Sequence, residues 1–175
     1  GVSVSDENEP VELGGWKIDV VDRTGECAVA VERLSELAER VLRDERVEEA
    51  EVGVAIVDDL EMARLHVQFL QIDGPTDVLT FPLHGDSLET WSGPLEALRG
   101  ADRRIGGEVV IGGDTAGRVA GELGTDVSEE VILYLVHGLL HLCGYDDQDD
   151  LQRQQMRRRE AEVLSLLEVA VRVER

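Results

Sequence analysis

The chain has 175 residues, 42% of them hydrophobic and 3% aromatic, so its composition suits one compact domain with an aliphatic core. Its formal net charge of -21 argues against a broad nucleic-acid-binding face, because phosphate contacts depend on Lys and Arg. The sequence has no apolar run of about 18 residues and only two cysteines, so neither a membrane span nor a disulfide framework is expected.

The first 15 residues are polar and acidic, which is the opposite of a signal peptide. We therefore expect a flexible acidic tail at residues 1–15, a single folded domain at residues 16–175 and a reducing, cytoplasmic compartment. Neither DNA nor a membrane is expected as a partner. The sequence indicates no oligomeric state.

In chain order, the hydrophobic pattern predicts a strand at residues 16–22, a helix at 27–45, a strand at 50–59, a helix at 60–70, a strand at 76–83, a loop-like section at 84–106, a strand at 107–113 and helices at 114–124, 127–144 and 149–171. Asp58 or Asp59 could cap the second helix, and Pro82 is expected to end the third strand. The elements predict one α+β domain with a mixed four-stranded sheet packed with about five α-helices.

The stretch HGLLHLCGYDD, residues 137–147, predicts a metal site at the end of a central helix. His137 and His141 are four positions apart, so both imidazoles lie on one helical face and their nitrogens can meet one zinc ion at about 2.0–2.1 Å. Gly144 then ends the helix, and the chain can fold back to offer a third ligand from Tyr145, Asp146 or Asp147.

The spacing of this stretch also indicates which chemistry is absent. Asp147 stands ten residues after His137, which is the ligand spacing of the H-x-x-x-H-x-x-G-x-x-H zinc peptidases. In the H-E-x-x-H peptidases the glutamate after the first histidine is the general base, and here that position is Gly138. A peptidase is therefore disfavoured. The alternative that both histidines merely pack in a helix is disfavoured by the glycine and aspartate that follow them.

Three motifs resemble those of one known family. HGLLHLCGYDD is similar to the H-G-x-L-H-L-x-G-Y-D-H signature of the YbeY family of metal-dependent endoribonucleases, which act in ribosomal RNA maturation. PTDVLTFP, residues 75–82, resembles the family's P-T-D-V-L-S-F-P, and GGEVVIGGDTA, residues 106–116, resembles its L-G-D-I-x-I-S-x-x-x-A. Met156 and Glu160 fit its M-x-x-x-E pattern.

The resemblance implies one zinc ion per chain, held in the family by three histidines, and hydrolysis of single-stranded RNA. His137 and His141 match the first two ligands, whereas the third falls on Asp147. Aspartate is a competent zinc ligand, but it is shorter than histidine, and its charge should raise the pKa of a bound water. Asp147 could instead mark a site that has lost its metal, or His84 could be a substitute ligand.

The same motifs suggest roles for other residues near the site. Asp146 matches the family's own aspartate and could orient the imidazoles. Cys143 falls on an apolar position and is expected to pack in the core. Thr76 and Asp77 could shape the substrate groove or stabilise their turn.

A departure from the family concerns LHVQFLQIDGPTD, residues 65–77, where the family has L-N-x-x-Y-R-x-x-D-x-P-T-D. His66 replaces the asparagine, and Leu70 replaces an arginine that is functional in the family. Arg64, one turn away, could be a substitute contact for phosphate.

The resemblance to the YbeY family implies a zinc-dependent, single-strand-specific endoribonuclease that acts in maturation of the small-subunit ribosomal RNA 3′ end and in ribosome quality control. Its expected catalytic residues and metal ligands are His137, His141 and Asp147, its substrate contacts are Thr76, Asp77 and Arg64, and its partners are ribosomal RNA and the small ribosomal subunit. The attacking group could be a water or the RNA's own 2′-hydroxyl. The alternatives are a ribosome-associated maturation factor of the same fold with weak or lost catalysis, and a metallohydrolase with a non-RNA substrate.

Overall fold

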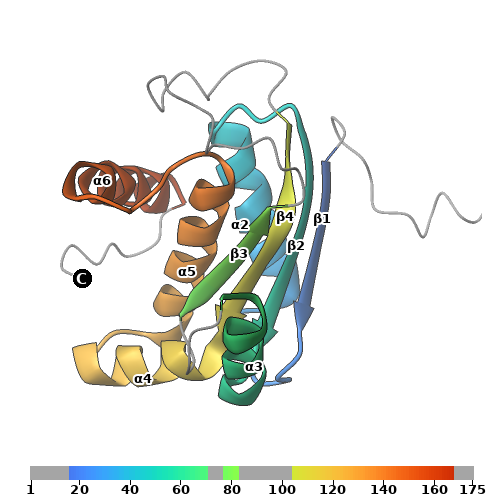
Figure 1. The fold of residues 1–175 in the computed structure, drawn as a ribbon, viewed down its shortest axis with the longest axis vertical. Coiled ribbons are helices and arrows are strands. Elements are labelled where there is room, and N and C mark those ends of the chain that lie inside the picture. Colours follow the sequence, from blue (N-terminus) through green and yellow to red (C-terminus); the bar gives the residue numbers. More distant parts are fainter. Residues whose placement is uncertain (1–15, 71–76, 83–103, 168–175) are drawn as a thin grey trace, which may run out of the picture.

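The computed structural model describes residues 16–70, 77–82 and 104–167. Four strands form one mixed sheet in the order β1-β2-β4-β3 (Figure 1): β1 (Trp16–Asp22), β2 (Glu49–Val57), β4 (Arg104–Gly112) and β3 (Val78–Pro82). Strands β1, β2 and β4 are parallel, and β3 pairs antiparallel with β4. The predicted mixed four-stranded sheet is confirmed.

The described part of the chain also contains the five helices that the sequence predicts: α2 (Val31–Asp44), α3 (Asp59–Leu70), α4 (Gly113–Leu123), α5 (Val127–Leu142) and α6 (Asp150–Leu166). Side chains alternate across β4, and this places the helices on two faces. Val109 belongs to the main core with α2 and α5, whereas Val110 packs with Met62 of α3. Helix α6 lies beside the C-terminal end of α5 (Figure 1).

The N-terminal boundary of the first helix differs from its prediction. Residues 27–30 are not helical, and α2 begins at Val31. The carboxylate of Asp22 accepts hydrogen bonds from the backbone N–H groups of Thr24 and Cys27, at 2.9 and 3.0 Å. These bonds hold the chain in a turn after β1, because they give the backbone donors a partner other than a helix.

The other boundaries shift by fewer residues. β4 begins at Arg104, inside the section predicted as loop, because its pairing with β2 extends from Glu49. β3 ends at Pro82 as predicted, and Asp58 caps α3 by accepting from the N–H of Glu61 at 2.9 Å. The tail at 1–15, the segment 83–103 and the end of the last predicted helix after 167 lie outside the described residues.

Helix α5 is the centre of the core. Leu135, Val136, Leu139 and Leu140 are fully buried, so the helix is apolar on nearly all sides. Gly138 brings its backbone against β4, since a Cβ atom there would lie 2.5 Å from Cγ1 of Val109. The helix that carries both histidines is therefore fixed closely to the sheet.

Among the described residues, no helix has both the length and the apolar character that a membrane crossing requires.

Candidate metal centre

Three side chains converge at the C-terminal end of α5. Nε2 of His141 lies 3.1 Å from Nε2 of His137, and Oδ2 of Asp147 lies 3.7 Å from His137 Nε2 and 3.5 Å from His141 Nε2. A tetrahedral zinc ion holds its ligand atoms at about 2.0–2.1 Å, which places any two of them about 3.3–3.4 Å apart. The three donor atoms therefore form a triangle of the size that one such ion requires.

The turn after α5 brings Asp147 back toward the histidines. Gly144 has φ of 112°, and its N–H bonds to the carbonyl of His141 at 3.1 Å. The N–H of Tyr145 bonds to the carbonyl of Leu140 at 3.0 Å. These two bonds form a Schellman motif, in which a glycine adopts the left-handed conformation that other residues disfavour. The glycine thus reverses the chain within three residues of His141.

Glu160 of α6 fixes the orientation of the first imidazole. Its Oε1 lies 2.8 Å from Nδ1 of His137, and its side chain is only 4% exposed. A proton on Nδ1 that is donated to this carboxylate leaves the Nε2 lone pair of His137 directed at the donor triangle. This arrangement of carboxylate and histidine is typical of zinc sites.

The second imidazole is held in the form that binds metal. Burial lowers the pKa of His141, and the nearby His137 lowers it further, although Asp147 acts in the opposite direction. A neutral imidazole is the form that ligates a metal ion. The donor set of two imidazoles and one carboxylate is also one that zinc accepts in enzymes.

The position after the first histidine does not face the site. Gly138 points at β4, where a side chain would meet Val109 at 2.5 Å and Val78 at 3.3 Å. A glutamate at this position, as in the H-E-x-x-H peptidases, has no room between helix and sheet. The glycine is therefore required by packing, and it leaves the donor triangle without a neighbouring base on this helix.

Three further residues of the stretch are outside the donor triangle: Cys143, Tyr145 and Asp146. Asp146 accepts the N–H of Asp147 through Oδ1 at 2.8 Å, and the carboxylate that bonds to His137 is that of Glu160. The hydroxyl of Tyr145 donates to Glu45 at 3.3 Å. Cys143 is buried in the main core at 3% exposure, as predicted.

Of the three predicted substrate contacts, the structure describes Arg64 and Asp77. Arg64 is exposed on α3, which packs on the face of the sheet opposite α5. Asp77 bonds locally, accepting from the N–H of Val78 through its side chain and from the N–H of Gly112 through its carbonyl. Thr76, His84 and the side chain of Leu70 lie outside the described residues.

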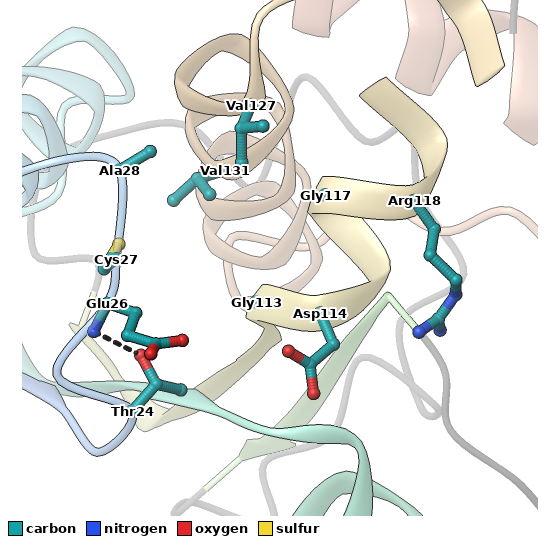
Figure 2. Close-up of a pocket in the computed structure, with 10 residues that line it drawn as sticks. All are labelled: Thr24, Glu26, Cys27, Ala28, Gly113, Asp114, Gly117, Arg118, Val127 and Val131. Carbon is teal, nitrogen blue, oxygen red and sulfur yellow. Dashed lines mark hydrogen bonds between the residues drawn. The ribbon is translucent and has the colours of Figure 1, made fainter. Parts of the chain in front are cut away.

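A separate cavity of about 510 Å³ lies between the turn after β1 and the start of α4 (Figure 2). Its lining includes Cys27, Asp114 and Arg118 but none of the three donor residues of the triangle. Arg118 pairs with Asp59 at 2.6 Å, and burial raises the pKa of the Cys27 thiol, which makes it a poor nucleophile at neutral pH. The cavity is therefore distinct from the metal centre.

The pattern M-x-x-x-E marks Glu160 in the sequence but does not indicate its contact with His137. A buried ionic cluster lies near the site and was not predicted from the sequence: in it Arg159 pairs with Glu45 at 2.6 Å and with Asp44. No local pattern joins these residues, because Glu45 and Arg159 are 114 positions apart.

Comparison with known protein families shows to which family the chain belongs. The model of the family described as Endoribonuclease YbeY matches residues 19–168, which is most of the sequence. The chain belongs to this family. The resemblance that the three motifs predict is thereby confirmed.

Two relatives named Endoribonuclease YbeY are matched over most of their length. The one from Syntrophotalea carbinolica is 35% identical over 85% of this chain and 93% of its own. The one from Pelotomaculum thermopropionicum is 42% identical over 77% of this chain and 84% of its own. The solution structure of TM1509 from Thermotoga maritima, at 24% identity, covers 90% of this chain and 99% of its own with a TM-score of 0.54, so the two share a fold.

Proposed function

We propose that this YbeY family member is a zinc-dependent endoribonuclease that cuts single-stranded RNA during maturation of the small-subunit ribosomal RNA 3′ end. The observation that carries the proposal is the triangle of His137, His141 and Asp147, whose donor atoms lie 3.1–3.7 Å apart. Membership of an endoribonuclease family supports the reaction class. Work in the cytoplasm on the small ribosomal subunit, including ribosome quality control, is part of the same proposal.

Each residue of the centre has a distinct task in this mechanism. His137, His141 and Asp147 would hold one zinc ion, and Glu160 would keep His137 in the tautomer with a free Nε2. A zinc ion bound there would polarise a phosphoryl oxygen and lower the pKa of a water. The side chain of Asp147 is 43% exposed, so solvent reaches the centre on the side of this residue.

The triangle favours phosphodiester over peptide hydrolysis. A metallopeptidase of this helical type takes its base from the position that Gly138 occupies, and β4 leaves no space for it. An RNA substrate offers an intramolecular nucleophile, its 2′-hydroxyl, whose proton solvent can accept, so this reaction does not require a base at position 138. Thr76, Asp77 and Arg64 remain proposed contacts for the substrate.

A second candidate is a maturation factor of the same fold with weak or lost catalysis. Two positions favour it: Leu70 stands where the family has a functional arginine, and Asp147 stands where it has the third histidine. The net charge of -21 also opposes a polyanionic substrate.

Metal analysis and RNA cleavage separate these candidates. Protein purified without added zinc is expected to hold one zinc ion per chain, and wild type but not His137→Ala is expected to cut single-stranded RNA. His66→Ala, on α3, is the matched control, and it is expected to keep both properties. Absence of stoichiometric metal, restored by Asp147→His, would overturn the active-enzyme proposal. A zinc-loaded protein without cleavage would favour the maturation factor.

A further inference from the structure

We propose that Glu45 is a positioning residue of the metal centre and acts through Tyr145 on Asp147. This inference rests on the proposed metal site. Glu45 follows the last residue of α2 and is fully buried. Its Oε2 accepts from the hydroxyl of Tyr145 at 3.3 Å and from Nε of Arg159 at 2.6 Å. One carboxylate thus joins α2, α6 and the turn that presents Asp147.

The position of Glu45 is costly unless it is paired. A carboxylate at a helix C-terminus meets the negative end of the helix dipole, and a fully buried charge loses its hydration. Arg159 compensates for both effects. Burial acts to lower the pKa of Arg159, but Glu45 and Asp44 raise it overall, so the guanidinium stays charged. The ion pair therefore fixes the Glu45 carboxylate relative to α6.

Tyr145 is consequently held at both ends. Its backbone N–H is bonded to Leu140 by the Schellman motif, and its hydroxyl is bonded to Glu45. Asp147 is only two residues further along the chain, so little backbone freedom remains between the anchor and the donor atom. An aspartate is shorter than the family's histidine, and fewer backbone positions let it reach the ion.

Helix α6 supports the centre from two adjacent residues. Arg159 and Glu160 are 6% and 3% exposed, and they contact Glu45 and His137 respectively. The same helical turn therefore sets the place of a histidine donor directly and, through Glu45 and Tyr145, the place of the aspartate donor. Helix α6 and the end of α2 together form the support of the site.

The two tyrosines of the chain provide a matched test. Tyr145→Phe removes the hydroxyl that reaches Glu45, and Tyr134→Phe removes one that donates to Glu130 within α5 at 3.2 Å, also in the core. We expect Tyr145→Phe to weaken zinc binding about 10- to 100-fold, as loss of a supporting contact does in other zinc sites. Tyr134→Phe should leave the zinc affinity unchanged. Competition with a chromophoric chelator measures both.

The d–d absorption of the Co²⁺-substituted protein gives a readout that stability alone does not move. Its intensity reports coordination geometry and should change in Tyr145→Phe but not in Tyr134→Phe, with metal-free unfolding measured to confirm that both fold. Equal zinc affinity and an equal Co²⁺ spectrum in all three proteins, or equal losses in both variants, would overturn the positioning role and leave the metal site intact. A wild type that binds no zinc would overturn the proposed function together with this inference.

Discussion

The close packing of α5 on the sheet leads to a quantitative prediction for Gly138→Ala. A Cβ at this position would lie 2.5 Å from Cγ1 of Val109 and 3.3 Å from Cγ2 of Val78. Val109 is fully buried and β-branched, so it cannot rotate freely away from the added methyl group. Such overpacking costs about 1–3 kcal/mol.

Part of this cost is offset, because alanine is a better helix former than glycine by about 1 kcal/mol. Gly121→Ala isolates that gain, since Gly121 lies in α4 and a Cβ there meets nothing within 4 Å. We therefore expect Gly121→Ala to raise the free energy of unfolding by up to about 1 kcal/mol. Gly138→Ala should be less stable than Gly121→Ala by about 1–3 kcal/mol, the full cost of the overpacking.

Urea unfolding of the metal-free proteins, followed by circular dichroism, measures this difference as a shift in midpoint at constant slope. In thermal unfolding each kcal/mol corresponds to about 2–4 °C for a chain of this size. If both variants raise the unfolding midpoint by the same amount, the close approach of α5 to β4 is refuted. The argument that packing excludes a glutamate base at position 138 would then fail as well.

The remaining predictions concern the metal centre and the ionic cluster. Zinc at about 100 times its Kd should stabilise the wild type by about 2.7 kcal/mol, and a chelator should reverse this; a thermal-shift assay should show no such gain for His137→Ala. Arg159→Ala leaves Glu45 buried without its cation, so urea titration should give a loss of about 3–5 kcal/mol; a much smaller loss would contradict the buried pairing. Burial lowers the folded pKa of His141 below its unfolded value, so the unfolded state binds more protons and stability falls as the pH drops through about 6.5. The metal-free wild type should thus lose more stability than His141→Gln between pH 7.5 and 5.5, and equal losses would count against a buried neutral imidazole.

Periodicity and spacing were sufficient to predict the α+β class, the mixed sheet and the two histidine positions. The start of β4 at Arg104 and the start of α2 at Val31 were not predictable from the hydrophobic pattern. The first depends on pairing with β2, and the second depends on bonds from the Asp22 carboxylate. The pairing joins strands that are far apart in the sequence, whereas the Asp22 bonds reach only two and five residues along the chain and are missed because hydrophobic periodicity does not include side-chain hydrogen bonds.

The donor residues were predictable from the sequence, whereas the residues that support them were not. His137, His141 and Asp147 follow from helical spacing and a glycine turn, so a short motif contains them. The contacts of Glu160 with His137 and of Arg159 with Glu45 depend on how α6 packs. The sequence around residues 137–147 therefore does not indicate which side chains Glu160 and Arg159 contact.

The three donor residues lie within one stretch of the chain, whereas their supports come from far along it. Glu160 is 23 positions from His137, and Glu45 is 100 positions from Tyr145. Binding of a metal ion would therefore depend on how α6 and the end of α2 pack, in addition to the short stretch that carries the three donor residues.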